Sequence, residues 1–426
     1  MTATPLIINN FELQYVKIAL HNGKTVGLDV KSVMALEYSE GMMQKYVTVT
    51  MKIVDTTNTI SQALYGLEKV EFVMKDLIND VKYEFTNASA NGPLYIYEVH
   101  DKQIIDTAKV FVIELCRYDA IVNNTNRIGK KYTAIESSAL AGDVLAQFIK
   151  TKKPLNSTKS VNKLTFIPPN AKPYDVLVWA RNKYIANDQK STKSGGKYHS
   201  AGYFFYEDYN QYNFVSIDSL AASKKPRATY TTGTGLSGVD EYFRMNNPKF
   251  ETNLNLMRNF DKGFYSGKIE FFDIVNCEVE GAPYSITDSY SKWNKLGGQD
   301  DLPKIYKDVL SKSPTRIMAV SYNDDLFLES KKESTKNRMY FKETIAQSVS
   351  RFGVFTSQIL NASVYGNLVL NVGDIINIEM MDSDLKKDKT FSGKYILFGL
   401  RHIFSRGTPE GEFRTNMILV RDSFGA

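Results

Sequence analysis

Residues Ile359–Met380 read ILNASVYGNLVLNVGDIINIEM, and this stretch decides the fold class of the chain. Apolar and polar side chains alternate along it, and alternation with a period of two is typical of β-strands with one buried face. One strand is expected to bury Leu360, Ala362 and Val364, and the next, after a turn at Gly366, to bury Leu368, Leu370 and Val372. A tight turn at Gly373-Asp374 is expected before a third strand.

Two further strands follow this stretch in the sequence. KTFSGKYILFGLRHIF covers 389–404 and EFRTNMILVRDSFGA covers 412–426, and both show the same alternation. Gly393 stands where the first of them turns out of a charged loop. The last hundred residues are therefore predicted to form a β-meander with structural turns at Gly366, Gly373 and Gly393.

The N-terminal part of the chain is also rich in strands. From 11 to 119 one alternating segment follows another, as in YVTVTMKIVD at 46–55. Turn residues separate these segments at Asn79-Asp80 and at 91–93. Short strands at this spacing predict an antiparallel barrel or sandwich.

Helical periodicity interrupts the strands in the middle of the chain. Apolar residues recur at helical spacing in 137–153, and a second helix is expected to begin at Pro173, a favoured first-turn residue. A third helix is predicted over 338–352. Between them, 201–220 reads as a β-hairpin with its turn at 208–211 and with Tyr206 and Tyr212 among its aromatic residues.

Composition and charge exclude several classes of function. The chain has 426 residues, enough for more than one domain, and its net charge of +6 is too small to indicate nucleic-acid binding. No apolar window reaches the length of a membrane span, and the N-terminus does not read as a cleaved signal, so neither export nor stable membrane binding is expected. Cys116 and Cys277 are expected as buried thiols in a reducing cytosol, with a disulfide as the alternative.

No catalytic, cofactor-binding or metal-ligating set is predicted from the sequence. Gly233, Gly235 and Gly238 fit a dinucleotide-binding pattern, but no amphipathic helix follows, so we expect a glycine-rich loop that contacts another subunit. His402 is expected in a sheet or at an interface rather than at a metal, because its neighbours lack ligand spacing. The aromatic residues Tyr206 and Tyr212 are interpreted as core or subunit contacts.

Four further stretches, together with the C-terminus, resemble a known family. These are GLEKVEF at 66–72, FIPPNAKPYDVLVWARNKY at 166–184, the hairpin at 201–220 and NFDKGFYSGKIEFFD at 259–273. In this order they resemble the central baseplate hub protein of contractile-tailed, T-even-like bacteriophages. The same fold forms the N-terminal part of type VI secretion spike proteins.

This resemblance implies an α+β, mainly β fold with two antiparallel β-barrel domains and an inserted mixed α/β domain. The N-terminal barrel would comprise residues 1–119. The inserted domain would comprise 120–200, continued by 241–330, and the second barrel 201–240 plus 331–426.

The resemblance also implies a structural role without catalysis. The hub would be a homotrimeric ring. One side of the ring would bind the sixfold tail tube or a tube-initiator protein, and the other side would bind the trimeric spike. The ring would also contact other baseplate proteins and form part of the DNA channel. It would be assembled in the host cytoplasm and reside in the virion. A tail-associated cell-wall hydrolase or glycan-binding adhesin, and the hub part of a type VI-like secretion spike, are the alternatives.

Overall fold

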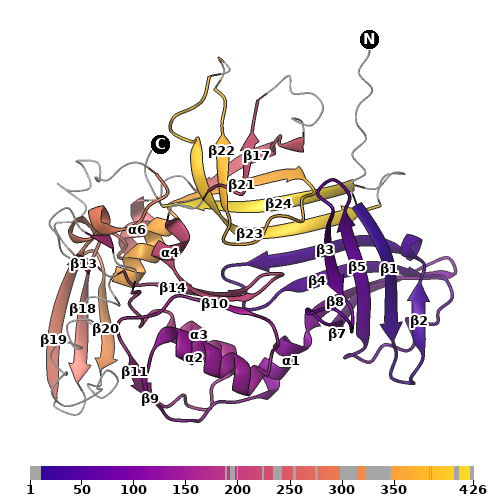
Figure 1. The fold of residues 1–426 in the computed structure, drawn as a ribbon, viewed down its shortest axis with the longest axis horizontal. Coiled ribbons are helices and arrows are strands. Elements are labelled where there is room, and N and C mark those ends of the chain that lie inside the picture. The colour runs from indigo at the N-terminus through magenta and orange to yellow at the C-terminus, as the bar shows by residue number, and fades with distance from the viewer. Residues whose placement is uncertain are drawn as a thin grey trace.

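The computed structural model describes residues 11–187, 190–191, 197–198, 200–222, 225–233, 242–252, 256–273, 277–297, 314–322, 345, 347–382, 384, 386–406 and 412–422. Figure 1 shows two groups of β-strands that lie against each other, with a helical segment below them and a smaller sheet at one side. The predicted α+β, mainly β architecture is confirmed.

The first strand group contains the N-terminal strands. Its members are β1 (Phe11–Ala19), β2 (Thr25–Leu28), β3 (Val33–Gly41), β4 (Thr48–Asp55), β5 (Lys69–Asp76), β6 (Val81–Phe85), β7 (Leu94–Ile105) and β8 (Ala108–Arg117), with a short 3-10 helix at Val30–Ser32. All pairings among these strands are antiparallel. The predicted turn at Asn79-Asp80 joins β5 to β6, and Asp80 there has a positive φ of 53°.

The second strand group contains most of the C-terminal strands. Its members are β16 (Ala228–Thr231), β17 (Asn246–Thr252), β21 (Gln358–Tyr365), β22 (Ile375–Glu379), β23 (Gly393–Ser405) and β24 (Glu412–Arg421). Strand β23 pairs with β3 over seven residue pairs, from Gly399 opposite Gly41 to Ser405 opposite Ala35. The two groups are therefore joined into one 14-stranded sheet.

The predicted C-terminal meander is right for its last three strands and wrong for its first. Strand β22 pairs with β23 and β23 pairs with β24, but β21 pairs with β24 and not with its sequential neighbour β22. The segment 366–374, expected to contain a strand, forms turns. Its backbone amides bind carboxylates of the first strand group: Leu368 donates to Asp76 at 3.1 Å and Val372 to Glu40 at 2.9 Å.

The middle of the chain forms a helical segment that covers one side of the strands. It contains α1 (Tyr118–Thr125), β9 (Tyr132–Ile135), α2 (Ser137–Asp143), a π-helix (Val144–Ile149), β10 (Leu155–Ser157), β11 (Leu164–Phe166), α3 (Pro173–Ala180) and the short pair β12 (Lys190–Ser191) and β13 (Lys197–Tyr198). The helices predicted over 137–153 and from Pro173 are confirmed, and Pro173 occupies the first turn of α3. Helix α1 was not predicted.

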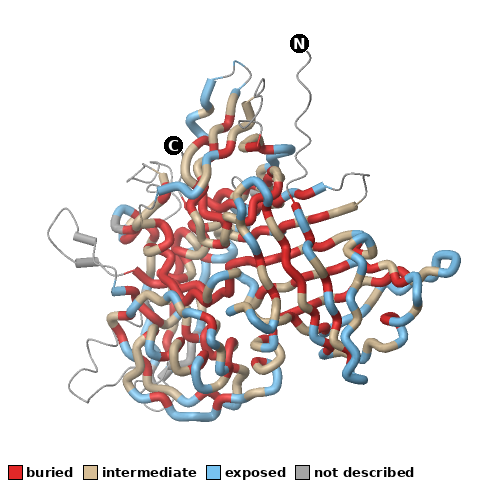
Figure 2. The backbone as a smooth tube through the Cα atoms, turned by 45° about the vertical axis from the view of Figure 1, so that its right-hand side comes forward, coloured by how far each residue is buried: buried red, intermediate tan, exposed pale blue. Residues whose placement is uncertain are grey.

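The hairpin of β14 (Tyr203–Glu207) and β15 (Tyr212–Ser216) is buried on both faces. One face, with Phe204 and Tyr206, packs into the core of the strand groups, and the other, with Tyr203 and Phe205, packs into the core of the helical segment. Strand β15 of the hairpin pairs with β10, whereas β16 pairs with β22. The segment 201–240, which was expected in the second barrel, is therefore shared between two sheets. Figure 2 shows buried backbone where these parts meet.

Helix α4 (Ile217–Ala221) follows the hairpin and packs into the core of the strand groups. The remaining elements form a satellite at one side of the molecule: α6 (Leu256–Asp261), β18 (Ser266–Asp273), β19 (Glu278–Ser285), two 3-10 helices (Ile286–Asp288 and Tyr290–Lys292) and β20 (Ile317–Tyr322). Residues 347–355 are helical, which agrees with the described part of the third predicted helix. Buried Arg351 on this helix binds Asp218 on α4 at 3.1 Å, Asp422 at 2.7 Å and the Asn294 carbonyl at 2.6 Å, and so ties α4 and the satellite to the C-terminus.

The two cysteines lie in different environments. Cys116 is buried on β8, and burial raises the pKa of its thiol to about 12. Cys277 is exposed, so the expectation that both thiols are buried is wrong for Cys277.

Candidate assembly surface

Eight strands of the large sheet lie side by side in the order β7-β8-β4-β3-β23-β24-β21-β17. Paired residues on antiparallel strands share a face, so the registers can be followed from strand to strand. One such row contains Tyr95, Cys116, Thr48, Ser39, Arg401, Asn416, Ser363 and Asn246. We call the face that carries this row the outer face.

The opposite face of the same eight strands is the core face. One residue along each strand from the row above, a second row of paired residues lies on this core face. It contains Ile96, Leu115, Val49, Tyr38, His402, Thr415 and Val364, and all seven are buried. His402 therefore sits in the core, where its Nδ1 lies 2.8 Å from the Thr415 hydroxyl. Burial lowers the pKa of His402 to about 3, so the ring is neutral at physiological pH.

Both ends of this eight-stranded run expose edge strands within the described residues. Beyond Ile96, β7 pairs only with β8, and β17 pairs only with β21. An unpaired edge offers backbone donors and acceptors to another strand. Strand β7 also exposes apolar side chains, with Ile104 73% and Ile105 54% exposed.

A loop beside β7 is held in a strained conformation and presents apolar side chains. Gly66 and Leu67 have φ angles of 100° and 67°, and Leu67 is 51% exposed. The buried Glu68 carboxylate fixes the loop by accepting the amides of Tyr65 at 2.6 Å and Gly66 at 3.0 Å. Such strain is typical of functional sites, because only the surrounding structure maintains it.

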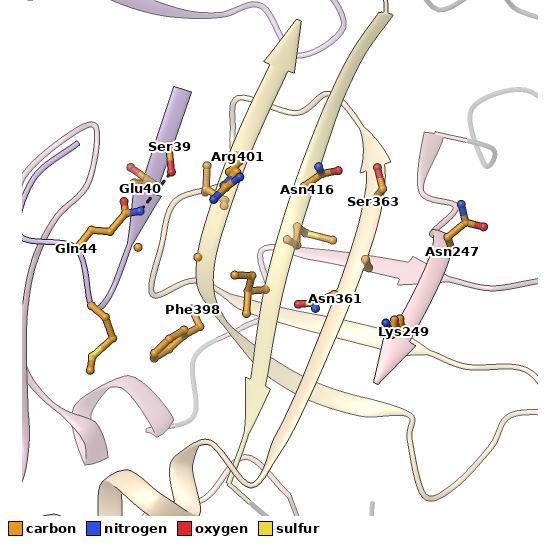
Figure 3. A pocket seen from close by; sticks show the side chains of 17 residues that line it. Ser39, Glu40, Gln44, Asn247, Lys249, Asn361, Ser363, Phe398, Arg401 and Asn416 are labelled. Carbon is orange, nitrogen blue, oxygen red and sulfur yellow. Dashed lines mark hydrogen bonds between the residues drawn. The ribbon is translucent and has the colours of Figure 1, made fainter. Parts of the chain in front are cut away.

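A groove of about 540 Å³ crosses the outer face of five strands, from β3 to β17. Figure 3 shows polar side chains of Arg401, Asn416, Ser363 and Lys249 along the groove, with Phe398 and Gln44 near one end. Gln44 is placed by a 3.4 Å hydrogen bond from its Nε2 to the Ser39 hydroxyl. The groove lining is therefore mixed, with amide and cationic groups beside apolar ones.

Glu40 links three distant parts of the chain beneath this groove. It is 1% exposed and accepts hydrogen bonds from the Tyr38 hydroxyl at 2.8 Å, the Tyr209 amide at 3.0 Å and the Val372 amide at 2.9 Å. Burial, and then the nearby Asp208 carboxyl, raise the pKa of Glu40 to about 8. Glu40 thus holds β3, the hairpin turn and the 366–374 segment together.

A second buried carboxylate, Glu207, joins the hairpin to both neighbouring parts. It lies 2.8 Å from Lys153 Nζ and 3.2 Å from Arg117 Nε, and it accepts the Val47 amide at 3.1 Å. Burial lowers the pKa of Lys153, and the Glu207 charge opposes that shift. Because Arg117 and Lys153 neutralise Glu207 inside the protein, this cluster fixes the helical segment against the strand groups.

The structure places most of the predicted site residues inside the chain. Tyr206 is 2% exposed and Tyr212 is 0% exposed, so their side chains pack in the two cores rather than face another subunit. His402 was expected either in a sheet or at an interface. It is equally buried, so its ring lies inside the sheet and not at the surface of the chain. Gly233 is partly buried and its amide binds the Thr231 hydroxyl at 3.1 Å, whereas Gly235 and Gly238 lie outside the described residues.

The three predicted turn glycines are each required by their surroundings. Gly373 and Gly393 have φ angles of 93° and 133°, which favour glycine. Gly366 has no room for a side chain, because a Cβ atom there would overlap the ring of Phe413.

The groove itself was missed by the sequence analysis. A usable signal was present: Gly41 and Gly399 each stand inside an alternating strand, where glycine marks a bulge or a close approach. Their pairing across β3 and β23 joins residues more than 350 positions apart, which periodicity alone does not show.

Within the described residues, no three His, Cys, Asp or Glu side chains are arranged to hold a metal ion. In that same part of the chain no helix is long and apolar enough to cross a membrane.

Comparison with solved structures identifies the fold. A tail protein from Neisseria meningitidis MC58 matches with a TM-score of 0.55 at 11% identity, covering 97% of this chain and 98% of that one. The 43 kDa tail protein of prophage MuSo2 from Shewanella oneidensis matches with a TM-score of 0.52 at 8% identity, covering 98% of this chain and 100% of that one. No family model and no curated protein matches the sequence. The chain therefore has the fold of these tail proteins.

Proposed function

We propose that this chain is the structural hub of a phage baseplate: a homotrimeric ring that connects the sixfold tail tube, or its initiator protein, to the threefold spike. It forms part of the channel for DNA and makes further contacts with other baseplate proteins. The role is non-catalytic, and the protein resides in the virion after assembly in the host cytoplasm. The tail-protein fold over nearly the whole chain is the first support for this proposal.

The observation that carries the proposal is the eight-stranded run, whose edges at β17 and at the part of β7 beyond Ile96 have no further strand partner among the described residues. It divides at the β3–β23 pairing into two four-stranded units, β7-β8-β4-β3 and β23-β24-β21-β17. Three chains arranged in a closed ring present six such units, which suits a sixfold partner on one side and a threefold partner on the other. A head-to-tail contact between the β7 edge of one copy and the β17 edge of the next would close the ring.

The domain boundaries expected from the sequence fit this arrangement only in part, because β17 lies in the 241–330 segment that was expected in the inserted domain. The segment 1–119 supplies one four-stranded unit, and 331–426 supplies three strands of the other. Strand β17, at 246–252, completes the second unit.

Light scattering on the purified chain tests the proposal directly. The expected mass is three times the chain mass of 48.3 kDa. Ile104→Asp, which places a charge on the exposed edge strand β7, is expected to weaken the trimer. Ile167→Asp is the matched control, because Ile167 is 61% exposed on the helical segment, away from both edges. A monomer at micromolar concentration, or equal loss of the trimer in both variants, would contradict this arrangement.

A further inference from the structure

The floor of the groove is bare backbone at one point. Gly41 on β3 and Gly399 on β23 face each other directly, so neither strand places a side chain there. A Cβ atom on Gly399 would meet Ile418 at 3.5 Å, and one on Gly41 would meet Gln44 at 3.5 Å, both ordinary contacts. Steric crowding within the chain therefore does not explain these two glycines. Glycine in a strand marks a bulge, and β23 has a register shift against β24 between Leu397 and Gly399, or it marks the close approach of a ligand or another backbone.

Apolar side chains surround this bare floor and are open to solvent. Met43 is 58% exposed and Ile418 is 42% exposed, and Phe398 is only partly buried. All three line the groove. A flat apolar group placed over the two glycines would cover them, and aromatic rings are the side chains that most often fill such pockets at interfaces.

The accessible charges of the lining are positive. Lys249 and Arg401 are exposed on β17 and β23. Glu40, the acidic residue of the lining, directs its oxygens to donors inside the protein. Two acidic side chains lie nearby without lining the groove: Glu37 is 3.4 Å from Arg401, and Glu251 accepts a 3.1 Å hydrogen bond from Asn361.

The length of the groove suits a polypeptide better than a small molecule. It crosses five strands, and neighbouring strands lie about 4.8 Å apart, so it spans about 19 Å. An extended chain covers that distance with about six residues.

We propose that this groove binds an extended acidic segment of a second protein, with one aromatic side chain seated over Gly41 and Gly399 and carboxylates beside Arg401 and Lys249. The exposed cations of the lining, Arg401 and Lys249, favour an acidic segment as the occupant. The proposal concerns the outer face of a single chain and does not depend on ring formation.

Fluorescence anisotropy with a labelled hexapeptide that alternates aspartate and phenylalanine tests the proposal. Two control peptides replace either every aspartate with lysine or every phenylalanine with alanine. The aspartate–phenylalanine peptide is expected to bind most tightly, and more weakly at high salt, because exposed charge pairs are screened.

Variants locate the binding on the protein. Gly399→Val fills the floor and is expected to weaken binding at least tenfold, with Gly399→Ala as a milder variant if valine disturbs folding. Arg401→Gln is expected to weaken binding about two- to fivefold, as for an exposed charge pair. Gly27→Val on β2 is the control, because a Cβ atom on Gly27 would have nothing within 4 Å.

Three results would overturn the proposal. They are the absence of binding by the aspartate–phenylalanine peptide, equal binding by wild type and Gly399→Val, and binding of the lysine peptide as tight as that of the aspartate peptide. A concentration-dependent self-association that Gly399→Val abolishes would instead assign the groove to a second copy of this chain.

Discussion

Gly373 packs directly against the hydroxyl group of Tyr206, so that a Cβ atom on Gly373 would overlap the Tyr206 oxygen. The backbone φ of 93° at Gly373 independently disfavours any other residue. Gly373→Val is therefore expected to lower the free energy of unfolding by about 2 to 4 kcal/mol, from backbone strain and overpacking together. Urea denaturation followed by circular dichroism measures this change.

Gly23→Val is the matched control for this prediction. Gly23 also has a positive φ, 79°, but nothing lies within 4 Å of a Cβ atom there. Its cost is expected to be backbone strain alone, about 1 to 2 kcal/mol. Equal costs for the two variants would show that the Tyr206 contact is unimportant.

The damage from Gly373→Val should extend beyond the second strand group. Val372 and Leu368, in the same segment, donate their amides to Glu40 and Asp76 of the first group. We therefore expect both groups to lose stability. Hydrogen exchange at β3 and β5 checks this, and unchanged protection there would contradict it.

Glu207→Gln is expected to destabilise the protein by about 3 to 5 kcal/mol, because it leaves Arg117 and Lys153 buried without their shared carboxylate. The measurement is again urea denaturation. Glu412→Gln is the control: it breaks the exposed 2.7 Å pair with Arg414 and should change stability by less than about 1 kcal/mol. A Glu207→Gln variant as stable as that control would show that this charged cluster does not stabilise the protein.

Stability is expected to fall as pH rises from 6.5 to 8. The pKa of Glu40 is raised from 4.5 to about 8 in the folded protein, so the folded state holds a proton that the unfolded state has released. Below pH 6.5 the lowered pKa of His402 acts in the opposite sense, because the unfolded state then binds the extra proton. Denaturation at several pH values measures the net effect.

Between pH 6.5 and 8 the expected loss is about 1 to 2 kcal/mol. Glu40→Gln should flatten this dependence, because an amide does not titrate, whereas His402→Gln should change the dependence only below pH 6.5. A wild-type free energy of unfolding that stays constant or rises between pH 6.5 and 8 would contradict the role given to Glu40.

The purified protein is expected to release no fragments from peptidoglycan. The buried carboxylates Glu40, Glu207 and Asp218 are engaged by donors inside the protein and do not face a cleft as an acid–base pair. Dye release from labelled cell walls measures this. Hydrolysis that a single side-chain substitution abolishes would show that the chain is an enzyme.

Local patterns in the sequence predicted much of the fold but not its pairings. The alternation at 358–365 matches the alternating burial of β21, and Pro173 correctly marked the start of α3. The same alternation misled at Leu368, Leu370 and Val372, which are buried without forming a strand. Their segment is held by Asp76 and Glu40, almost 300 or more residues away in sequence, and such contacts leave no local pattern.

The candidate surface was less predictable than the fold. Aromatic residues such as Tyr206 and Tyr212 were interpreted as core or subunit contacts, because alternation on a hairpin does not decide between the two. The hairpin that carries them is buried on both faces between two cores, so these side chains pack inside the chain. The groove depends on the β3–β23 pairing, and only the three-dimensional structure brings those strands together.

Electron microscopy of the purified protein, viewed along its symmetry axis, shows whether the chain forms a hub. We expect a threefold ring with six lobes around an open centre, because each chain contributes two four-stranded units. Particles of a single 48.3 kDa chain, or rings without threefold symmetry, would contradict the assignment of this protein as a hub.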